Sequence, residues 1–378
     1  MTLRIGVIAA SFGNPSPQGT LISSDFLMKS SGNNIGNWAF WYATQKLIGS
    51  NVTLLSAKPE SKDYRGKIDL IVIPAANWLQ PRYDFSWLAD FIEEMDMPCL
   101  VFGLGAQSHD NEKIPDLSEG TLRMLKAISM RTPYIGVRGE YTQKVCKSYN
   151  IDNVEVMGCP SLLINNATSL GQSIEKRWPQ HSKGKTVIHS TMFHNNVKHV
   201  EQWLFDYLNT HDNSSYIVQA PKAFIKPLFQ EDLHRKEIEF IEKYMGNFKE
   251  GVDTEEFLSI LYNKSYSPSS IDSWINYINF FSRSIGARIH GAILSLSATV
   301  PTVCITHDSR TEELCNVLQV PSISCKLIAK ETTINEVFDQ TDFDADAFNE
   351  NRIFRAQQFK GLFDETGVPS SKHLETYS

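Results

Sequence analysis

The chain has 378 residues, of which 42% are hydrophobic and 21% are charged, a balance typical of a globular protein of about two domains. The net charge of −7 argues against a nucleic-acid-binding protein, because such proteins usually present a basic face. The six cysteines form no C-x-x-C pair, and several lie in apolar runs. We therefore expect reduced, buried thiols in a cytoplasmic protein, and neither a zinc site nor a disulfide framework.

The first apolar run, 5–10, is too short for the core of a signal peptide and predicts a buried strand. No run approaches the roughly 18 apolar residues that a membrane-spanning helix needs, so we expect no transmembrane segment. Peripheral contact with the inner face of the membrane is left open.

The first half alternates short apolar runs with segments of helical periodicity, and a long loop over 11–34 follows the first run. Strands are expected at 4–9, 52–56, 69–73, 98–103, 134–137 and 154–157, and helices at 37–48, 85–94, 118–130 and 139–149. Such β-α-β alternation implies a parallel sheet covered by helices on both faces.

A polar stretch over 165–185 suggests a linker, and a second alternating unit follows it. Strands are expected at 186–190, 216–219, 284–287 and 302–306, and helices at 197–209, 231–245, 273–281, 289–298 and 345–363. We predict an α/β protein with two Rossmann-like, doubly wound domains facing a cleft. The expected divisions are 1–165, the linker 166–185, 186–340, and a helical tail over 341–378 that could pack back on the N-terminal domain.

Ligands of such sheets bind beyond the carboxyl ends of the strands, which draws attention to Arg288 and His290. Both follow the strand at 284–287, where the next helix begins near Ile289. The N–H groups of a first helical turn favour an anion, and an arginine fork suits a carboxylate or a phosphate. A histidine can move a proton near neutral pH. The alternative is a surface arginine beside a capping histidine.

Two more arginines occupy the same kind of position. Arg310 follows the strand at 302–306, where Ser309 or Thr311 could cap the next helix and Asp308 suits a turn. Arg138 follows the strand at 134–137, and its alternative is an ion pair with Glu140. Because sequential parallel strands tend to be neighbours, the Arg288 and Arg310 loops should meet at one edge of the cleft.

Amide side chains follow other strands of the first domain and could bind the hydroxyl groups of a sugar. These candidates are Asn33, Asn34, Asn37, Asn77 and Gln107. Each could equally satisfy the backbone of its own loop. His189 and His194 are too few to predict a metal site, so no metal is expected.

The block "SIGARIHGAILSLSATVPTVCITHDSR" resembles the signature of the polysaccharide pyruvyl transferase family, and weaker matches such as "LVFGLGAQ" and "IGVRGEYTQKV" extend the resemblance over about 32–321. It implies a glycosyltransferase-B-like pair of domains and the transfer of a pyruvyl group from phosphoenolpyruvate to a sugar as a cyclic ketal. By resemblance, His290 and Arg138 are catalytic, and Arg288, Arg310 and Ile289 bind the donor. The family often has lysine where this chain has Arg310, and its glycine-rich loop is here "PAANWL", without glycine.

The expected partners are phosphoenolpyruvate and a saccharide acceptor, with no cofactor and no nucleic acid. Whether the acceptor is lipid-linked, nucleotide-linked or polymeric stays open, as does the role of His290 as acid or base. Two alternatives remain. One is a nucleotide-sugar glycosyltransferase of the same architecture, and the other is a non-catalytic relative that binds sugars or anions.

Overall fold

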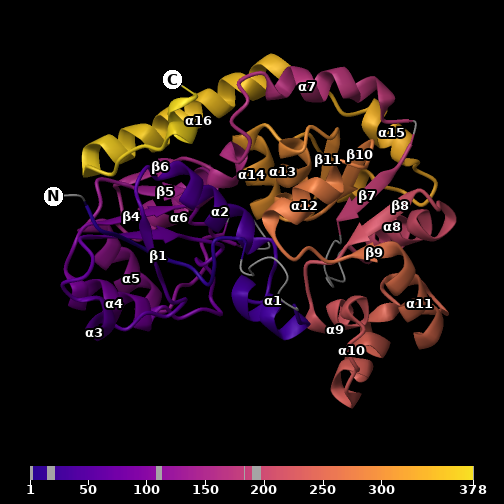
Figure 1. Cartoon of the computed structure of the whole chain (residues 1–378), viewed down its shortest axis with the longest axis horizontal. Coiled ribbons are helices and arrows are strands. Elements are labelled where there is room, and N and C mark those ends of the chain that lie inside the picture. Colours follow the sequence, from indigo (N-terminus) through magenta and orange to yellow (C-terminus); the bar gives the residue numbers. More distant parts are fainter. Residues whose placement is uncertain (1–2, 15–21, 108–112, 183, 190–196, 378) are drawn as a thin grey trace.

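A computed structural model describes residues 3–14, 22–107, 113–182, 184–189 and 197–377. Two parallel sheets lie side by side, each flanked by helices, and a long helix near the C-terminus runs above the first sheet as far as the junction with the second (Figure 1). The predicted α/β fold with two Rossmann-like units is thereby confirmed. The two sheets fall within the ranges expected for the two domains, while the domain boundaries themselves remain a prediction.

The first sheet has the strand order β2-β1-β3-β4, with all pairs parallel. A two-stranded parallel sheet, β5-β6, adjoins it, because the Leu104 N–H donates to the carbonyl of Gly136 at 3.2 Å. The bounds are β1 Ile5–Ile8, β2 Val52–Leu55, β3 Leu70–Pro74, β4 Cys99–Phe102, β5 Ile135–Val137 and β6 Val154–Val156. Each predicted strand of the first half is present.

The second sheet is entirely parallel, with the order β12-β11-β10-β7-β8-β9. Its strands are β7 Thr186–His189, β8 Ser214–Ile217, β9 Ser265–Tyr266, β10 Arg283–Gly286, β11 Thr302–Thr306 and β12 Ser322–Ser324. Since β10 and β11 are neighbours, the loops that follow them meet at one edge of the sheet, as predicted.

Helices cover both faces of the sheets. Those of the first half are α1 Ser24–Ser31, α2 Asn37–Leu47, α3 Ser61–Tyr64, α4 Ser86–Met95, α5 Glu119–Ser129 and α6 Glu140–Ser148. The others are α7 Leu170–Arg177, α8 Lys198–Thr210, α9 Lys222–Ile225, α10 Arg235–Met245, α11 Thr254–Lys264, α12 Ile271–Ile278, α13 Ile289–Ser297, α14 Ser309–Leu318, α15 Ile334–Asp339, α16 Ala345–Thr366 and α17 Lys372–Glu375.

Two segments are more ordered than the sequence suggested. The loop expected over 11–34 contains α1, which is capped by the Ser23 side chain and ends at Gly32 in the left-handed conformation. The polar stretch expected as a linker contains α7, which is held to α16 through the Asn349 side chain. Both helices are only eight residues long, so their stability comes from tertiary contacts and not from local propensity.

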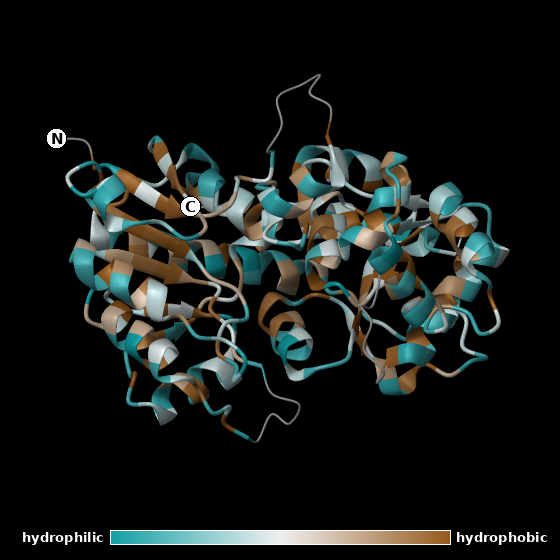
Figure 2. Cartoon of the chain, turned by 90° about the horizontal axis from the view of Figure 1, so that it is seen from below, coloured by the Kyte–Doolittle hydropathy of each residue, from teal (hydrophilic) through white to brown (hydrophobic). Residues whose placement is uncertain are grey.

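The apolar core runs continuously from one sheet to the other, and a second apolar cluster lies among α4, α5 and α6 and the first sheet. Figure 2 shows hydrophobic residues concentrated on the inner strands and hydrophilic ones on the outer helices. Among the described residues, no helix is both long and apolar enough to span a bilayer.

Candidate active site

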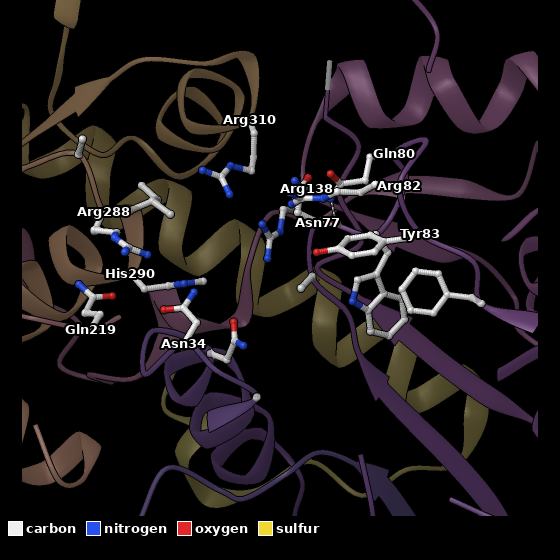
Figure 3. Close-up of a pocket in the computed structure, with 17 residues that line it drawn as sticks. Asn34, Asn77, Gln80, Arg82, Tyr83, Arg138, Gln219, Arg288, His290 and Arg310 are labelled. Atoms are coloured by element: carbon white, nitrogen blue, oxygen red, sulfur yellow. Dashed lines mark hydrogen bonds between the residues drawn. The ribbon is translucent and has the colours of Figure 1, made fainter. Parts of the chain in front are cut away.

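A cavity of about 390 Å³ lies where the carboxyl ends of strands from both sheets face each other (Figure 3). Its volume falls in the range of roughly 300–1,000 Å³ that is common for small-ligand sites. It is lined by Gly32, Asn34, Asn37, Ala76, Asn77, Trp78, Gln80, Arg82, Tyr83, Phe85, Arg138, Gln219, Ala287, Arg288, Ile289, His290 and Arg310. All three predicted arginines and the predicted histidine therefore meet in one cavity.

Arg288 lies at the junction of β10 and α13 and occupies the N-cap position of the helix. The residue is buried, and its Nε and Nη2 atoms have no hydrogen-bond partner within the described part of the chain. Burial, followed by repulsion from Arg310, lowers the pKa of Arg288 to about 10. Unpaired N–H groups of a buried guanidinium are costly unless a ligand satisfies them, so this fork is suited to an anion.

Arg310 lies in the first turn of α14, and Asp308 caps that helix by accepting from the Thr311 N–H at 2.8 Å. The cap expected from Ser309 or Thr311 is wrong, because Asp308 supplies it and Thr311 completes a capping box with Asp308. Asp308 also lies 3.3 Å from Nη2 of Arg310, while Nε of Arg310 has no partner among the described residues. The Arg310 guanidinium is therefore only partly paired with Asp308, and its Nε–H group could donate to an anion.

Arg138 follows β5 and is buried at the floor of the cavity, where its Nε donates to the carbonyl of Gly103 at 2.8 Å. Burial is the main cause that lowers its pKa, and Arg310 adds to it. The alternative ion pair with Glu140 is not formed among the described residues. The nearby carboxylate is Glu313, which accepts from the N–H of Thr142 at 3.0 Å.

His290 is the second residue of α13 and points into the same space. Its ring packs against Phe40, with centroids 5.5 Å apart, and Nε2 lies 3.7 Å from Sγ of Cys159. Burial lowers the pKa of His290 to about 3, and the charges of Arg138, Arg310 and Arg288 add to this effect. In the empty cavity the imidazole is therefore neutral at pH 7.

The five candidate amides divide into two groups. Asn34, Asn37 and Asn77 line the cavity, whereas Asn33 and Gln107 do not. Asn33 adopts a left-handed turn conformation with φ of 65°. Gln107 accepts a hydrogen bond from Asn77 and donates weakly to Asp308 at 3.5 Å. Gln107 therefore supports cavity residues and does not line the cavity itself.

Several lining residues were not predicted from the sequence. They are Trp78, Gln80, Arg82, Tyr83 and Phe85, which lie between β3 and α4, and Gln219, which follows β8. Gln219 could have been found by the same strand-end rule, because β8 ends two residues before it. The aromatic residues lie up to eleven positions beyond a strand, and no local pattern brings them back to it.

His189 lies in β7, buried behind α13, with its Nε2 atom 3.1 Å from Oγ of Ser295, whereas His194 lies outside the described residues. Where the structure describes the chain, no three side chains of the metal-binding types His, Cys, Asp and Glu are grouped to hold an ion.

Fold and cavity together define a two-sheet α/β protein with a strongly cationic cleft. The profile of the polysaccharide pyruvyl transferase family matches residues 34–309, and the chain belongs to this family of transferases acting on polysaccharides. None of the curated proteins matches the chain.

Two solved structures show a distant similarity to the chain. The "S. aureus MnaA-UDP co-structure" is 7% identical, with 90% of this chain and 86% of that chain covered and a TM-score of 0.41. The N-terminal domain of Candida albicans trehalose-6-phosphate phosphatase is 11% identical, with 84% of this chain and 73% of that chain covered and a TM-score of 0.38.

Proposed function

We propose that the protein transfers a pyruvyl group from phosphoenolpyruvate to two hydroxyl groups of one sugar, which yields a cyclic pyruvate ketal and phosphate. The observation that carries this proposal is the buried fork of Arg288, which lacks partners among the described residues and shares a cavity with Arg138, Arg310 and His290. Phosphoenolpyruvate carries a carboxylate and a phosphate, and three arginines around one cavity match that charge.

The donor would lie between the N-terminus of α13 and Arg310, with Arg138 closing the site from the other sheet. The unpaired N–H groups of Arg288 and the first-turn N–H groups beginning at Ile289 would bind its anionic groups. The proposed reaction needs neither a metal nor an organic cofactor.

The proposed chemistry begins with a proton added to the methylene carbon, which makes it a methyl group and leaves positive character on C2. One sugar hydroxyl adds at C2, the bond from C2 to the phosphate oxygen breaks, and a second hydroxyl closes the ketal. Two C–O bonds form and one breaks. Of the two hydroxyl protons, one balances the new methyl group and the other leaves with phosphate.

His290 is the group we assign to the proton transfer. It is neutral in the empty cavity, because burial and three arginines disfavour its charged form. A bound anion offsets the field of the arginines and raises the pKa of His290, so that it can take a hydroxyl proton or deliver one within the filled site. A positioned acid or base of this kind contributes about 10²–10⁴-fold to the rate.

The test is release of phosphate from phosphoenolpyruvate with a panel of galactosides, mannosides and glucosides. We expect acceptor-dependent release by the wild-type protein, and a loss of about 10²-fold or more in His290→Ala. The exposed His211 lies away from the cavity, so His211→Ala is the matched control. Wild-type activity in His290→Ala would refute the assignment. Transfer from a nucleotide sugar, with no binding of phosphoenolpyruvate, would support the glycosyltransferase alternative instead.

A further inference from the structure

Three aromatic side chains form one side of the cavity, and we call Trp78, Tyr83 and Phe85 the aromatic wall. The ring centroids of Trp78 and Phe85 lie 4.8 Å apart, and those of Tyr83 and Phe85 lie 5.8 Å apart. Trp78 and Phe85 are half-buried and Tyr83 is 37% exposed, so ring surface remains open to the cavity. In Figure 3, Tyr83 projects its hydroxyl toward Arg138, across the cavity from Arg288 and His290.

Backbone pairing holds the first ring of the wall, Trp78, in place. The N–H of Leu79 donates to the carbonyl of Gly105 at 3.0 Å, and the N–H of Gly105 donates to Ala76 at 2.9 Å. The segment carrying Trp78 is therefore paired with the segment that follows β4 and extends the sheet. A site carried on such paired backbone is preorganised, so that little conformational entropy is lost when a ligand binds.

Polar groups border the rings. Oδ1 of Asn77 is buried and has no hydrogen-bond partner within the described part of the chain. Gln80 and Arg82 also line this side, and the Arg82 guanidinium lies over the Tyr83 ring, 5.0 Å from its centroid. An amide oxygen left without a donor costs free energy, which a ligand hydroxyl would recover.

We propose that the aromatic wall is the subsite for the terminal pyranose ring of the acceptor. A pyranose ring has a face of C–H bonds that can pack on the electron-rich face of an aromatic ring, and a rim of hydroxyl groups that need polar partners. With its C–H face on Trp78 and Tyr83, the sugar presents hydroxyl groups to Asn77 on one side and toward Arg138 and His290 on the other. This inference rests on the proposed function, because it assigns that reaction's acceptor.

The neighbouring rings of the wall are not parallel, because the planes of Trp78 and Phe85 meet at 32° and those of Tyr83 and Phe85 at 69°. A planar base can also stack on a single exposed ring, so uridine monophosphate is the competing ligand in the test.

The experiment separates acceptor binding from donor binding. Binding of the methyl glycosides of galactose, glucose and mannose is followed by saturation-transfer NMR, and binding of phosphoenolpyruvate is followed by the shift in melting temperature. We expect Trp78→Ala to weaken glycoside binding about tenfold, as the loss of one stacking ring predicts, and to leave the phosphoenolpyruvate shift unchanged. Trp78→Phe should recover part of the lost glycoside affinity. Such a recovery would show that the aromatic ring itself contributes, and that the loss in Trp78→Ala does not come from a misfolded loop.

Trp87→Ala is the matched control, because Trp87 packs beside Phe85 at 6.3 Å but does not line the cavity, and it should bind glycosides as the wild type does. Unchanged glycoside binding in both Trp78→Ala and Tyr83→Ala would overturn the subsite. Absence of binding by all three glycosides would also overturn it. So would a Trp78→Ala protein that loses binding of uridine monophosphate but binds the glycosides as the wild type does. If glycoside binding depends on Trp78 but phosphoenolpyruvate produces no shift in melting temperature, the proposed function is refuted and the subsite is retained.

Discussion

The charge of the cavity depends on residues that lack partners in the described chain. Arg288 contributes a buried guanidinium with two nitrogen atoms that lack partners among the described residues, and Arg310 has the carboxylate of Asp308 at 3.3 Å. Burial, together with the charges of Arg138, Arg310 and Arg288, lowers the pKa of His290 to about 3. A bound anion would offset this field, so ligand binding and protonation of His290 are thermodynamically linked.

The linkage predicts a pH dependence for sulfate, which stays doubly charged from pH 5 to pH 8. The pKa of His290 lies near 3 in the empty cavity, and the anion raises it. Binding then takes up a proton wherever the pH lies between the two values, so sulfate affinity should rise as the pH falls from about 7.5 to about 5. Isothermal titration across this range measures it, with His290→Gln as the comparison. If sulfate affinity depends on pH equally steeply in His290→Gln, a group other than His290 takes up the proton.

At the scale of elements, the site depends on how closely α13 packs on β7 and β10. Gly286 ends β10 with φ of 153°, and a Cβ atom there would lie 2.1 Å from the carbonyl oxygen of His189. A Cβ atom on Gly291 would lie 2.4 Å from Nδ1 of the same histidine. Two glycines therefore let the N-terminus of α13, with Arg288 and His290, approach the sheet.

Gly291→Ala should lower the free energy of unfolding by about 1–3 kcal/mol, because the buried His189 ring has no space to yield. It should also reduce the rise in melting temperature that phosphate produces, since the helix end that carries Arg288 must shift. Chemical denaturation and thermal unfolding measure the two effects. Gly361→Ala is the control, because a Cβ atom there in α16 meets no atom within 4 Å, and it should be neutral or stabilise by up to about 1 kcal/mol. Equal stability of Gly291→Ala and the wild type would contradict this account of the packing.

The elements that position the arginines could be predicted from sequence, because short apolar runs followed by polar strand ends are a local signal. The strand β11 and the helix α13 begin within a residue of their predicted positions. The loop that carries Trp78 directly follows a predicted strand, but Tyr83 and Phe85 lie farther beyond that strand, and no local pattern places their rings at the cavity. The helices α1 and α7 were missed because their stability comes from tertiary contacts.

At the scale of the whole molecule, α16 joins the two halves. The Phe359 ring packs edge-on against Phe102 of β4, with centroids 5.3 Å apart. Arg355 donates from Nη1 to the carbonyl of Val156 in β6 at 2.8 Å, and from Nη2 to the carbonyl of Val317 in α14 at 3.3 Å. One side chain thus spans from the first-half strand β6 to the second-half helix α14, behind the cleft that brings Arg138 to Arg288 and Arg310.

Arg355→Ala should lower the free energy of unfolding by roughly 1 kcal/mol, because two charged hydrogen bonds and the packing of the arginine stem are lost, while Gln358 and Asn351 still donate to the two carbonyl groups. It should also weaken phosphate binding, although Arg355 is absent from the cavity lining, because Arg138 and Arg288 come from opposite sides of the junction. Thermal unfolding with and without phosphate measures both effects. Arg235→Ala is the matched control, since the Arg235 side chain is 92% exposed and bonds to Glu239 one turn away. Lower stability with unchanged phosphate affinity would mean that the cleft is held by the continuous apolar core, and that α16 contributes stability without setting the distance between the arginines.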